Sequence, residues 1–270
     1  MDTPRIRRAL VTGASAGIGA AFARALAQRG LALVLTARRR DRLDALAAQL
    51  RAAHGVAVDV YPEDLADPAA PRRLVAALER DDLAVDLLIN NAGYGVPGAF
   101  AANPWPRHAD FIQVLITAPT ELTHRLLPAM QARGYGRIIN VASLAGHLPG
   151  TPGHTLYAAA KAYLIRFSQS LARESRRHGV HVTALCPGFT YSEFHDVTGA
   201  RAQVSTMPAW MWMRADTVAV QGLDAVERGE IVHVNGRVNR AIKTLFKILP
   251  DRAALALMAR RSRGSAEPQP

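Results

Sequence analysis

Tyr157 and Lys161 are the residues of this sequence with the clearest capacity for chemistry. They bound the run Tyr157-Ala158-Ala159-Ala160-Lys161, and Thr155 just before it is a suitable N-cap, so a helix is predicted. Residues four positions apart share one helix face. A phenol normally gives up its proton near pH ~10, and a neighbouring ammonium favours the phenolate. The pair therefore predicts a tyrosine acid/base catalyst; the alternative is a chance spacing in which Lys161 is a solvated charge.

A glycine-rich turn near the N-terminus is the second feature with a chemical meaning. The apolar stretch 9–12 predicts a short strand before it, and the stretch 20–26 predicts a helix after it. Backbone amides in such a turn bind a pyrophosphate, and glycines leave room where a Cβ would obstruct. The turn predicts a dinucleotide site, with a plain turn as the alternative. Its residues are Thr12-Gly13-Ala14-Ser15-Ala16-Gly17-Ile18-Gly19.

Three arginines, Arg38 to Arg40, follow the second apolar stretch, 31–37. An NAD site favours an acidic residue here, whereas an arginine accommodates the 2′-phosphate of NADP. The arginines open the next predicted helix, where the positive dipole end disfavours each cation by ~0.3 to 1 kcal/mol unless an anion is bound. The sequence therefore predicts NADP(H) rather than NAD(H), with Arg38 as the first candidate contact. The alternative is a solvated loop.

Strands and helices alternate through the chain and must position these residues. Further strands are predicted at 56–61, 85–89, 137–142, 180–186 and 231–234, and helices at 68–80 and 105–133. Continuous apolar strands are typical of a parallel sheet that is buried on both faces. The pattern predicts one α/β domain, a Rossmann-type doubly wound parallel sheet with helices on both faces. Its ligand is expected at the carboxyl ends of the strands, where Gly13, Arg38, Asp64 and Asn91 fall.

The composition limits the class of protein. Hydrophobic residues make up 49% of the 270 residues and Cys186 is the single cysteine, so a large core is available and a disulfide framework is not. We expect a cytoplasmic protein, because no signal-peptide core is present and no run approaches the ~20 apolar residues of a membrane span. The net charge of +11 comes from scattered arginines. It predicts attraction for a small anionic ligand, with no metal site and no nucleic-acid partner.

The ordered motifs together resemble the classical short-chain dehydrogenase/reductase family over nearly the whole chain. They are the glycine turn, Asn90-Asn91-Ala92-Gly93, Ser143, Tyr157-x-x-x-Lys161 and Pro187-Gly188. The resemblance implies an NAD(P)(H) oxidoreductase in which Tyr157 exchanges a proton, Lys161 lowers the pKa of that tyrosine and holds the nicotinamide ribose, and Ser143 binds the substrate oxygen. It also implies cofactor contacts by Asp64, Leu65, Asn91, Ala92, Gly93, Pro187, Gly188 and Ser192.

Two positions depart from the family pattern. Ser143 and Tyr157 are fourteen positions apart, one more than usual, and the loop 146–153 is expected to hold the extra residue. The family's tetrad Asn corresponds to Leu115 here. Pro119 has no N–H and leaves the Leu115 carbonyl without its helical partner, so we hypothesise that the backbone supplies what Asn usually supplies. The alternative is a kinked helix in a slow or inactive enzyme.

The sequence as a whole predicts an NADP(H)-dependent carbonyl reductase or alcohol dehydrogenase, acting on an apolar ketone, aldehyde or secondary alcohol. Aromatic residues and methionines in the predicted lid, 190–214, favour such a substrate, although a core or subunit contact would use them equally well. The alternative function is a dinucleotide-binding regulatory or partner protein with weak or lost catalysis, which the substitution at Leu115 suggests.

The C-terminal part contains an amphipathic helix. Apolar residues recur at helical spacing between Ile242 and Leu249, flanked by basic residues. We expect this face to pack on its own domain or on a second subunit, with weak peripheral membrane contact as the other reading. One domain is expected over 1–258 and a disordered basic tail over 259–270. The family resemblance implies a homodimer or homotetramer.

Overall fold

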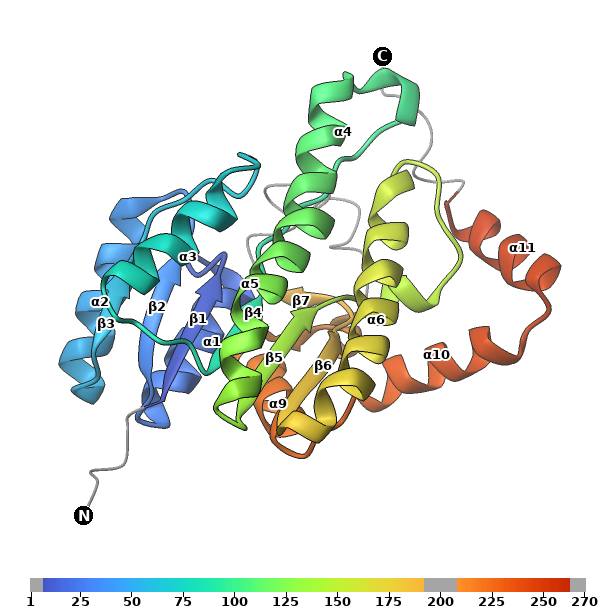
Figure 1. Cartoon of the computed structure of the whole chain (residues 1–270). Coiled ribbons are helices and arrows are strands. Elements are labelled where there is room, and N and C mark those ends of the chain that lie inside the picture. Colours follow the sequence, from blue (N-terminus) through green and yellow to red (C-terminus); the bar gives the residue numbers. More distant parts are fainter. Residues whose placement is uncertain (1–6, 192–207, 263–270) are drawn as a thin grey trace.

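The computed structural model describes residues 7–191 and 208–262, and a parallel sheet lies at its centre (Figure 1). Seven strands are hydrogen-bonded in the order β3-β2-β1-β4-β5-β6-β9. This is the predicted doubly wound arrangement. The strands are β1 (Arg8–Thr12), β2 (Ala32–Thr36), β3 (Val58–Val60), β4 (Leu87–Asn90), β5 (Gly136–Val141), β6 (Val180–Cys186) and β9 (Val232–Val234).

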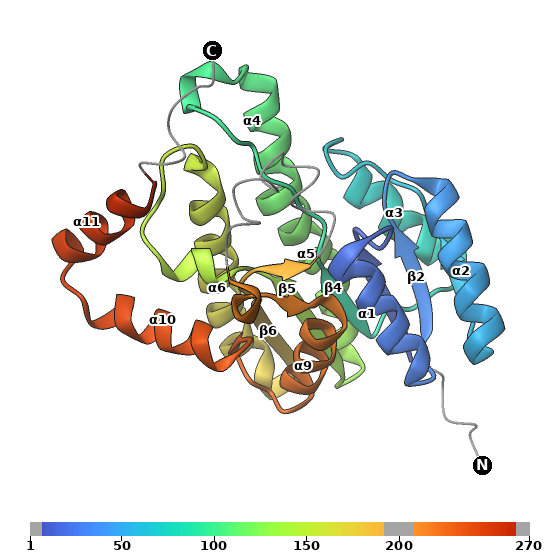
Figure 2. The same ribbon diagram turned by 180° about the vertical axis from the view of Figure 1, so that it is seen from behind.

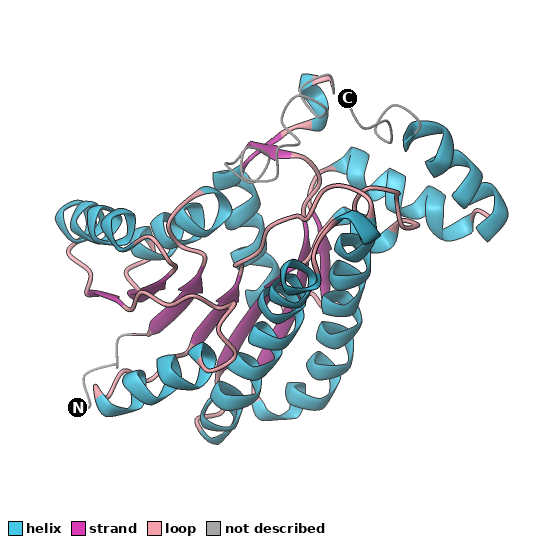
Figure 3. Cartoon of the chain, turned by 90° about the horizontal axis from the view of Figure 1, so that it is seen from above, coloured by secondary structure: helices cyan, strands magenta, loops and turns pink. Residues whose placement is uncertain are grey.

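Helices cover both faces of the sheet (Figure 3). One layer consists of α1 (Gly17–Gln28), α2 (Arg40–His54) and α9 (Ala215–Glu227). The other contains α3 (Ala70–Arg80), α5 (Ala118–Ala132) and α6 (Thr155–Ser175). Alternate residues of β1 enter the two cores, Val11 the first and Leu10 the second, and both are fully buried. This is why the strands are apolar at every position instead of every second one.

The remaining helices lie around the carboxyl ends of the strands. The predicted helix over 105–133 is interrupted: α4 (Trp105–Ile112) continues through a π-helical turn, Gln113–Thr117, into α5. After β9 the chain forms α10 (Arg237–Ile248) and α11 (Asp251–Ser262). Short 3-10 turns occur at Phe100–Ala102, Leu144–His147, Arg176–His178 and Ala209–Met211.

The strand order reverses beside β1, which pairs with β2 on one side and with β4 on the other. At such a switch point the loops after neighbouring strands diverge to opposite faces and leave a crevice for a ligand. The glycine turn follows β1 and Asn91 follows β4, so both stand at this crevice. Ser143 and Pro187 come shortly after the ends of β5 and β6, at the same edge.

The predicted lid is bracketed by a small second sheet. β7 (Thr190–Tyr191) pairs in parallel with β8 (Met213–Arg214), a pairing that the sequence analysis does not anticipate. Residues 192–207, including the predicted cofactor contact Ser192, lie outside the described residues. At the C-terminus α11 runs past residue 258 as far as Ser262. No helix among 7–191 and 208–262 is long and apolar enough to cross a membrane.

Candidate active site

The glycine turn is held against the loop after β4 by hydrogen bonds. The Thr12 Oγ1 accepts the backbone N–H groups of Asn91 at 2.9 Å and Ala92 at 3.0 Å. The Asn91 side-chain amide donates back to the Thr12 carbonyl at 2.9 Å. Gly13 has φ +65°, and a Cβ on Gly19 would overlap the Gly13 carbonyl oxygen, so only glycine lets α1 begin this close to the turn. The backbone therefore forms the open cradle that a pyrophosphate requires.

Arg39 is the arginine that contacts this turn. Its guanidinium donates to the Ser15 Oγ from Nη2 at 3.0 Å and from Nε at 3.3 Å. Arg38 is exposed instead. Burial raises the pKa of Tyr94 in the loop after β4, and the charge of Arg38 acts in the opposite direction. Both arginines follow the end of β2, next to the glycine turn, a suitable environment for a phosphate on the adenosine ribose.

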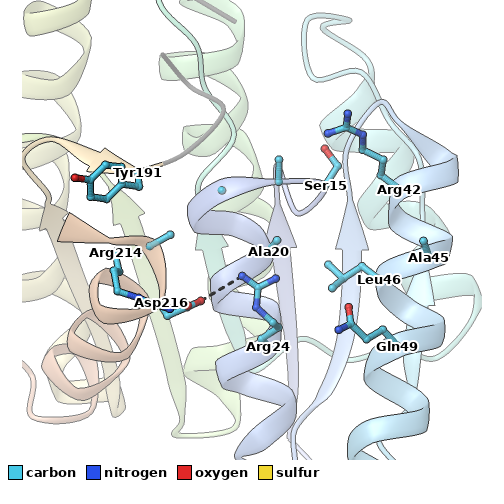
Figure 4. A pocket seen from close by; sticks show the side chains of 13 residues that line it. Ser15, Ala20, Arg24, Arg42, Ala45, Leu46, Gln49, Tyr191, Arg214 and Asp216 are labelled. Carbon is cyan, nitrogen blue, oxygen red and sulfur yellow. Dashed lines mark hydrogen bonds and ion pairs between the residues drawn. The ribbon is translucent and has the colours of Figure 1, made fainter. Parts of the chain in front are cut away.

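A cleft of about 950 Å³ opens beside the turn, along the groove between α1 and α2 (Figure 4). Ser15 and Arg42 lie at its upper end, and Tyr191 and Arg214 face them from the other side. Its lower wall includes Arg24, paired with Asp216 of α9 at 3.2 Å. The cleft lining does not include Ser143, Tyr157 or Lys161, so it extends from the phosphate turn and not from the predicted catalytic residues.

Ser143, Tyr157 and Lys161 are brought together where β5 meets α6. A side-chain hydrogen bond joins Ser143 to Tyr157. The Lys161 Nζ donates to the Val141 carbonyl at 2.7 Å and lies 5.7 Å from the centroid of the Tyr157 ring. The three predicted residues therefore share one site at the carboxyl edge of the sheet.

A close contact between the turn after Ser143 and α6 fixes this geometry. The Ser143 Oγ accepts the Ala145 N–H at 3.1 Å and caps the 3-10 turn Leu144–His147. Within that turn, a Cβ on Gly146 would lie 2.7 Å from the backbone carbonyl carbon of Lys161. Any larger residue would push the turn away from α6. Glycine is therefore required at position 146. The sequence analysis places this residue only in the loop 146–153 that holds the extra residue.

Burial dominates the proton equilibria of the pair. It raises the pKa of Tyr157 to about 12, against the hydrogen bond from Ser143, which lowers it. Burial likewise lowers the pKa of Lys161 to about 8. In the free protein the Lys161 ammonium is bonded to the Val141 carbonyl and has no effect on the pKa of Tyr157, so the predicted lowering of that pKa by Lys161 stays a prediction. Tyr157 is a neutral phenol at physiological pH, as a proton donor must be.

Leu115 lies in the π-helical turn and packs toward the same site. It is 1% exposed and belongs to an apolar cluster that includes Ala160 and Tyr157. The Ala118 N–H bonds to the Gln113 carbonyl five residues earlier, which is the π-helical pattern. The Pro119 carbonyl accepts the Thr123 hydroxyl at 2.7 Å and the Asn90 amide at 3.3 Å. The predicted irregularity of this helix is thus present, centred on the position of the missing Asn.

Other predicted residues fall at the same edge, with varied roles. The Asp64 carboxylate accepts the Ala66 N–H at 3.0 Å, and Leu65 is buried. A Cβ on Gly188 would collide with Asn239 of α10, so glycine is needed here for the close approach of α10, a role that the sequence analysis misses.

Cys186 is buried and its pKa is raised to about 12 by that burial, in line with a core position. No three His, Cys, Asp or Glu residues of the described ranges gather as a metal site requires.

Comparison with known proteins identifies the class that this fold and site define. The family model for short chain dehydrogenases matches residues 7–202. Nodulation protein G of Rhizobium sp. strain N33 is 36% identical over 240 residues, which cover 85% of this chain and 96% of that protein. Serine 3-dehydrogenase of Agrobacterium fabrum is 37% identical, covering 73% of this chain and 77% of that protein. The protein is an oxidoreductase with a Rossmann-type fold.

Solved structures agree with that class. A short-chain dehydrogenase from Sphingobium yanoikuyae, in complex with NADPH, superposes with a TM-score of 0.79 at 34% identity, covering 91% of this chain and 97% of that one. The bulky-bulky ketone specific alcohol dehydrogenase from Comamonas testosteroni gives a TM-score of 0.74 at 31% identity, covering 91% and 96%. The chain belongs to the short-chain dehydrogenase/reductase family.

Proposed function

We propose that the protein is an NADP(H)-dependent carbonyl reductase or alcohol dehydrogenase for apolar, bulky ketones, aldehydes or secondary alcohols. The observation that carries the proposal is the meeting of Ser143, Tyr157 and Lys161 at the strand edge that also carries the glycine turn. Membership of an oxidoreductase family favours this function over the regulatory alternative. We place the enzyme in the cytoplasm, where its single cysteine stays reduced, as a homodimer or homotetramer.

The residues at the site have distinct proposed roles in the reaction. Ser143 binds the substrate oxygen, and Tyr157 donates a proton to that oxygen while the carbonyl carbon is reduced. Lys161 would hold the nicotinamide ribose, and its ammonium, no longer bonded to the Val141 carbonyl, would lower the pKa of Tyr157. When bound, NADPH supplies the hydride. In oxidation Tyr157 takes up the proton instead.

The other proposed cofactor contacts lie in the glycine turn, at the arginines after β2 and at the carboxyl edge of the sheet. Gly13, Ser15, Gly17, Ile18 and Gly19 would hold the pyrophosphate, because the turn and the start of α1 expose N–H groups there. Arg39 with Ser15 would bind the 2′-phosphate, and Arg38 would flank it. Asp64, Leu65, Asn91, Ala92, Gly93, Pro187 and Gly188 remain proposed contacts at the same edge.

The preference for an apolar substrate is supported by aromatic side chains at the two ends of the predicted lid. The Trp212 ring stacks on Tyr191 with centroids 4.8 Å apart and lies 5.5 Å from the Phe189 ring. Such rings are suited to contact bulky apolar groups. The similarity to a bulky-bulky ketone specific alcohol dehydrogenase points in the same direction.

A turnover assay distinguishes the proposed enzyme from the alternative, a dinucleotide-binding regulatory protein with weak or lost catalysis. Purified protein is expected to oxidise NADPH with a panel of apolar ketones and aldehydes. The Tyr157→Phe variant should lose at least about a hundredfold in kcat, because it removes only the proton donor. Its affinity for NADPH, measured by fluorescence titration, should stay within about twofold. Retained turnover in this variant would refute the role of Tyr157, and tight NADPH binding without turnover in the unmodified protein would favour the regulator.

A further inference from the structure

Helix α10 is amphipathic, and only part of its apolar side is covered by the rest of the molecule. On the covered side, Ile242 packs on the core cluster that contains Leu144 and Cys186. Asn239 is buried against Gly188 and donates to the Asn235 carbonyl at 2.8 Å. These contacts hold α10 to the strand edge that carries the active site. Other apolar residues of the helix are exposed.

We define the exposed face by its large apolar side chains. On α10 these are Val238, Leu245 and Ile248, which are 39%, 45% and 73% exposed. Their spacing of seven and three residues aligns them in one stripe along the helix. On α11 Leu255 and Leu257 are also exposed, but residues two positions apart point to different sides of a helix, so they do not extend this stripe. Figures 1 and 2 show both helices extending away from the sheet, beyond α6, instead of joining either layer.

The charge of α10 indicates which kind of surface could cover this stripe. The helix carries four basic residues and no acidic one in Arg237–Ile248, within a chain whose net charge is +11. Arg237, Arg240 and Lys247 are exposed. A second copy of the chain would place equal positive charges opposite each other, which is unfavourable. An anionic lipid surface offers both the opposite charge and an apolar layer for the stripe.

We propose that the exposed face of α10, its apolar stripe with the basic residues that flank it, docks on the surface of an anionic lipid bilayer. The apolar stripe enters the boundary between headgroups and acyl chains, and the basic residues contact the headgroups. The protein lies on the membrane without crossing it. Because the adjoining face of α10 packs through Ile242 on the cluster that contains Leu144, in the turn that follows Ser143, the site for the substrate would lie close to the lipid surface. This inference is independent of the substrate proposed above.

Co-sedimentation of the full chain with vesicles tests the proposal. The protein should bind vesicles of phosphatidylglycerol and phosphatidylcholine, and bind pure phosphatidylcholine vesicles at least about tenfold more weakly. The double variant Leu245→Ser/Ile248→Ser should reduce binding to the anionic vesicles by about tenfold or more. Lys247→Glu should reduce it by about fivefold or more, and higher salt should weaken it further.

Matched variants elsewhere on the surface serve as controls. Val220→Ser alters a 41% exposed valine of α9, and Arg72→Glu alters an exposed arginine of α3. Neither should change vesicle binding, and thermal unfolding should confirm that every variant is folded. Absent binding to anionic vesicles, or equal binding by the α10 variants and the controls, would overturn the proposal. If binding is absent while Leu245→Ser/Ile248→Ser dissociates an oligomer in sedimentation velocity, the face is an interface between copies.

Discussion

The proton chemistry of the site is set by the environment of two side chains. The phenol of Tyr157 has its pKa raised to about 12 and the ammonium of Lys161 has its pKa lowered to about 8, both mainly by burial. The neutral form is favoured in each case, because a buried charge loses its hydration. In the free protein, then, the phenol stays protonated throughout the physiological range, whereas the lysine titrates close to it.

The pH dependence of reduction should follow Lys161. Its pKa is lowered from 10.5 to about 8, so the ammonium is present below pH 8 and is lost as the pH rises through that value. Since the pKa of Tyr157 is about 12, the phenol does not titrate in this window. We expect kcat/KM for NADPH, which reports on the free protein, to fall between pH 7 and pH 10, following a single group near 8. A profile that stays flat over this range would contradict the role of Lys161.

Cofactor preference should depend on Arg39 more than on its neighbours. Its guanidinium is fixed by Ser15 at the turn, whereas Arg38 and Arg40 are exposed. Losing a charge-assisted contact to the 2′-phosphate costs about 1.5 to 3 kcal/mol, so Arg39→Ala should raise the KM for NADPH by about tenfold or more. The KM for NADH should change little. Arg40→Ala is the matched control, and a larger effect there than in Arg39→Ala would refute the assignment.

The element that distinguishes this chain from the family pattern is the π-helical turn between α4 and α5. It covers the position of the family's Asn, and Pro119 follows two residues after its end. A proline cannot donate to the Leu115 carbonyl, so that oxygen lacks its usual α-helical partner. We propose that this backbone oxygen serves the proton path to Lys161, in place of the missing side chain.

Restoring the missing N–H should therefore slow the enzyme. In Pro119→Ala the new N–H can close an α-helical bond to the Leu115 carbonyl, and we expect kcat to fall by about tenfold with little change in the KM for NADPH. Pro128→Ala, an exposed proline of the same helix, is the control for altered helix stability. Full activity in Pro119→Ala, together with no change in Leu115→Asn, would refute the proposal that the Leu115 carbonyl replaces the family's Asn side chain.

At the scale of the whole molecule, periodicity and motif order predict most of the fold. The seven strands lie within two residues of their predicted bounds, because an apolar run buried on both faces has few alternatives. Contacts between distant segments could not be predicted. Arg39 meets Ser15 and Gly188 meets Asn239 only because the sheet topology brings their loops together. The burial that raises the pKa of Tyr157 could not be predicted for a related reason: spacing along a helix indicates proximity to Lys161 but not burial.

Transfer of deuterium from the cofactor tests the central claim most directly. The full chain is incubated with a bulky apolar ketone and NADPH that carries deuterium at C4 of the nicotinamide on either face, and the product is analysed by mass spectrometry. We predict an alcohol with deuterium at the former carbonyl carbon, from one of the two labelled cofactors, and none from the Tyr157→Phe variant. Failure to form labelled alcohol from either cofactor across the panel, while NADPH binds, would contradict the assignment as a carbonyl reductase.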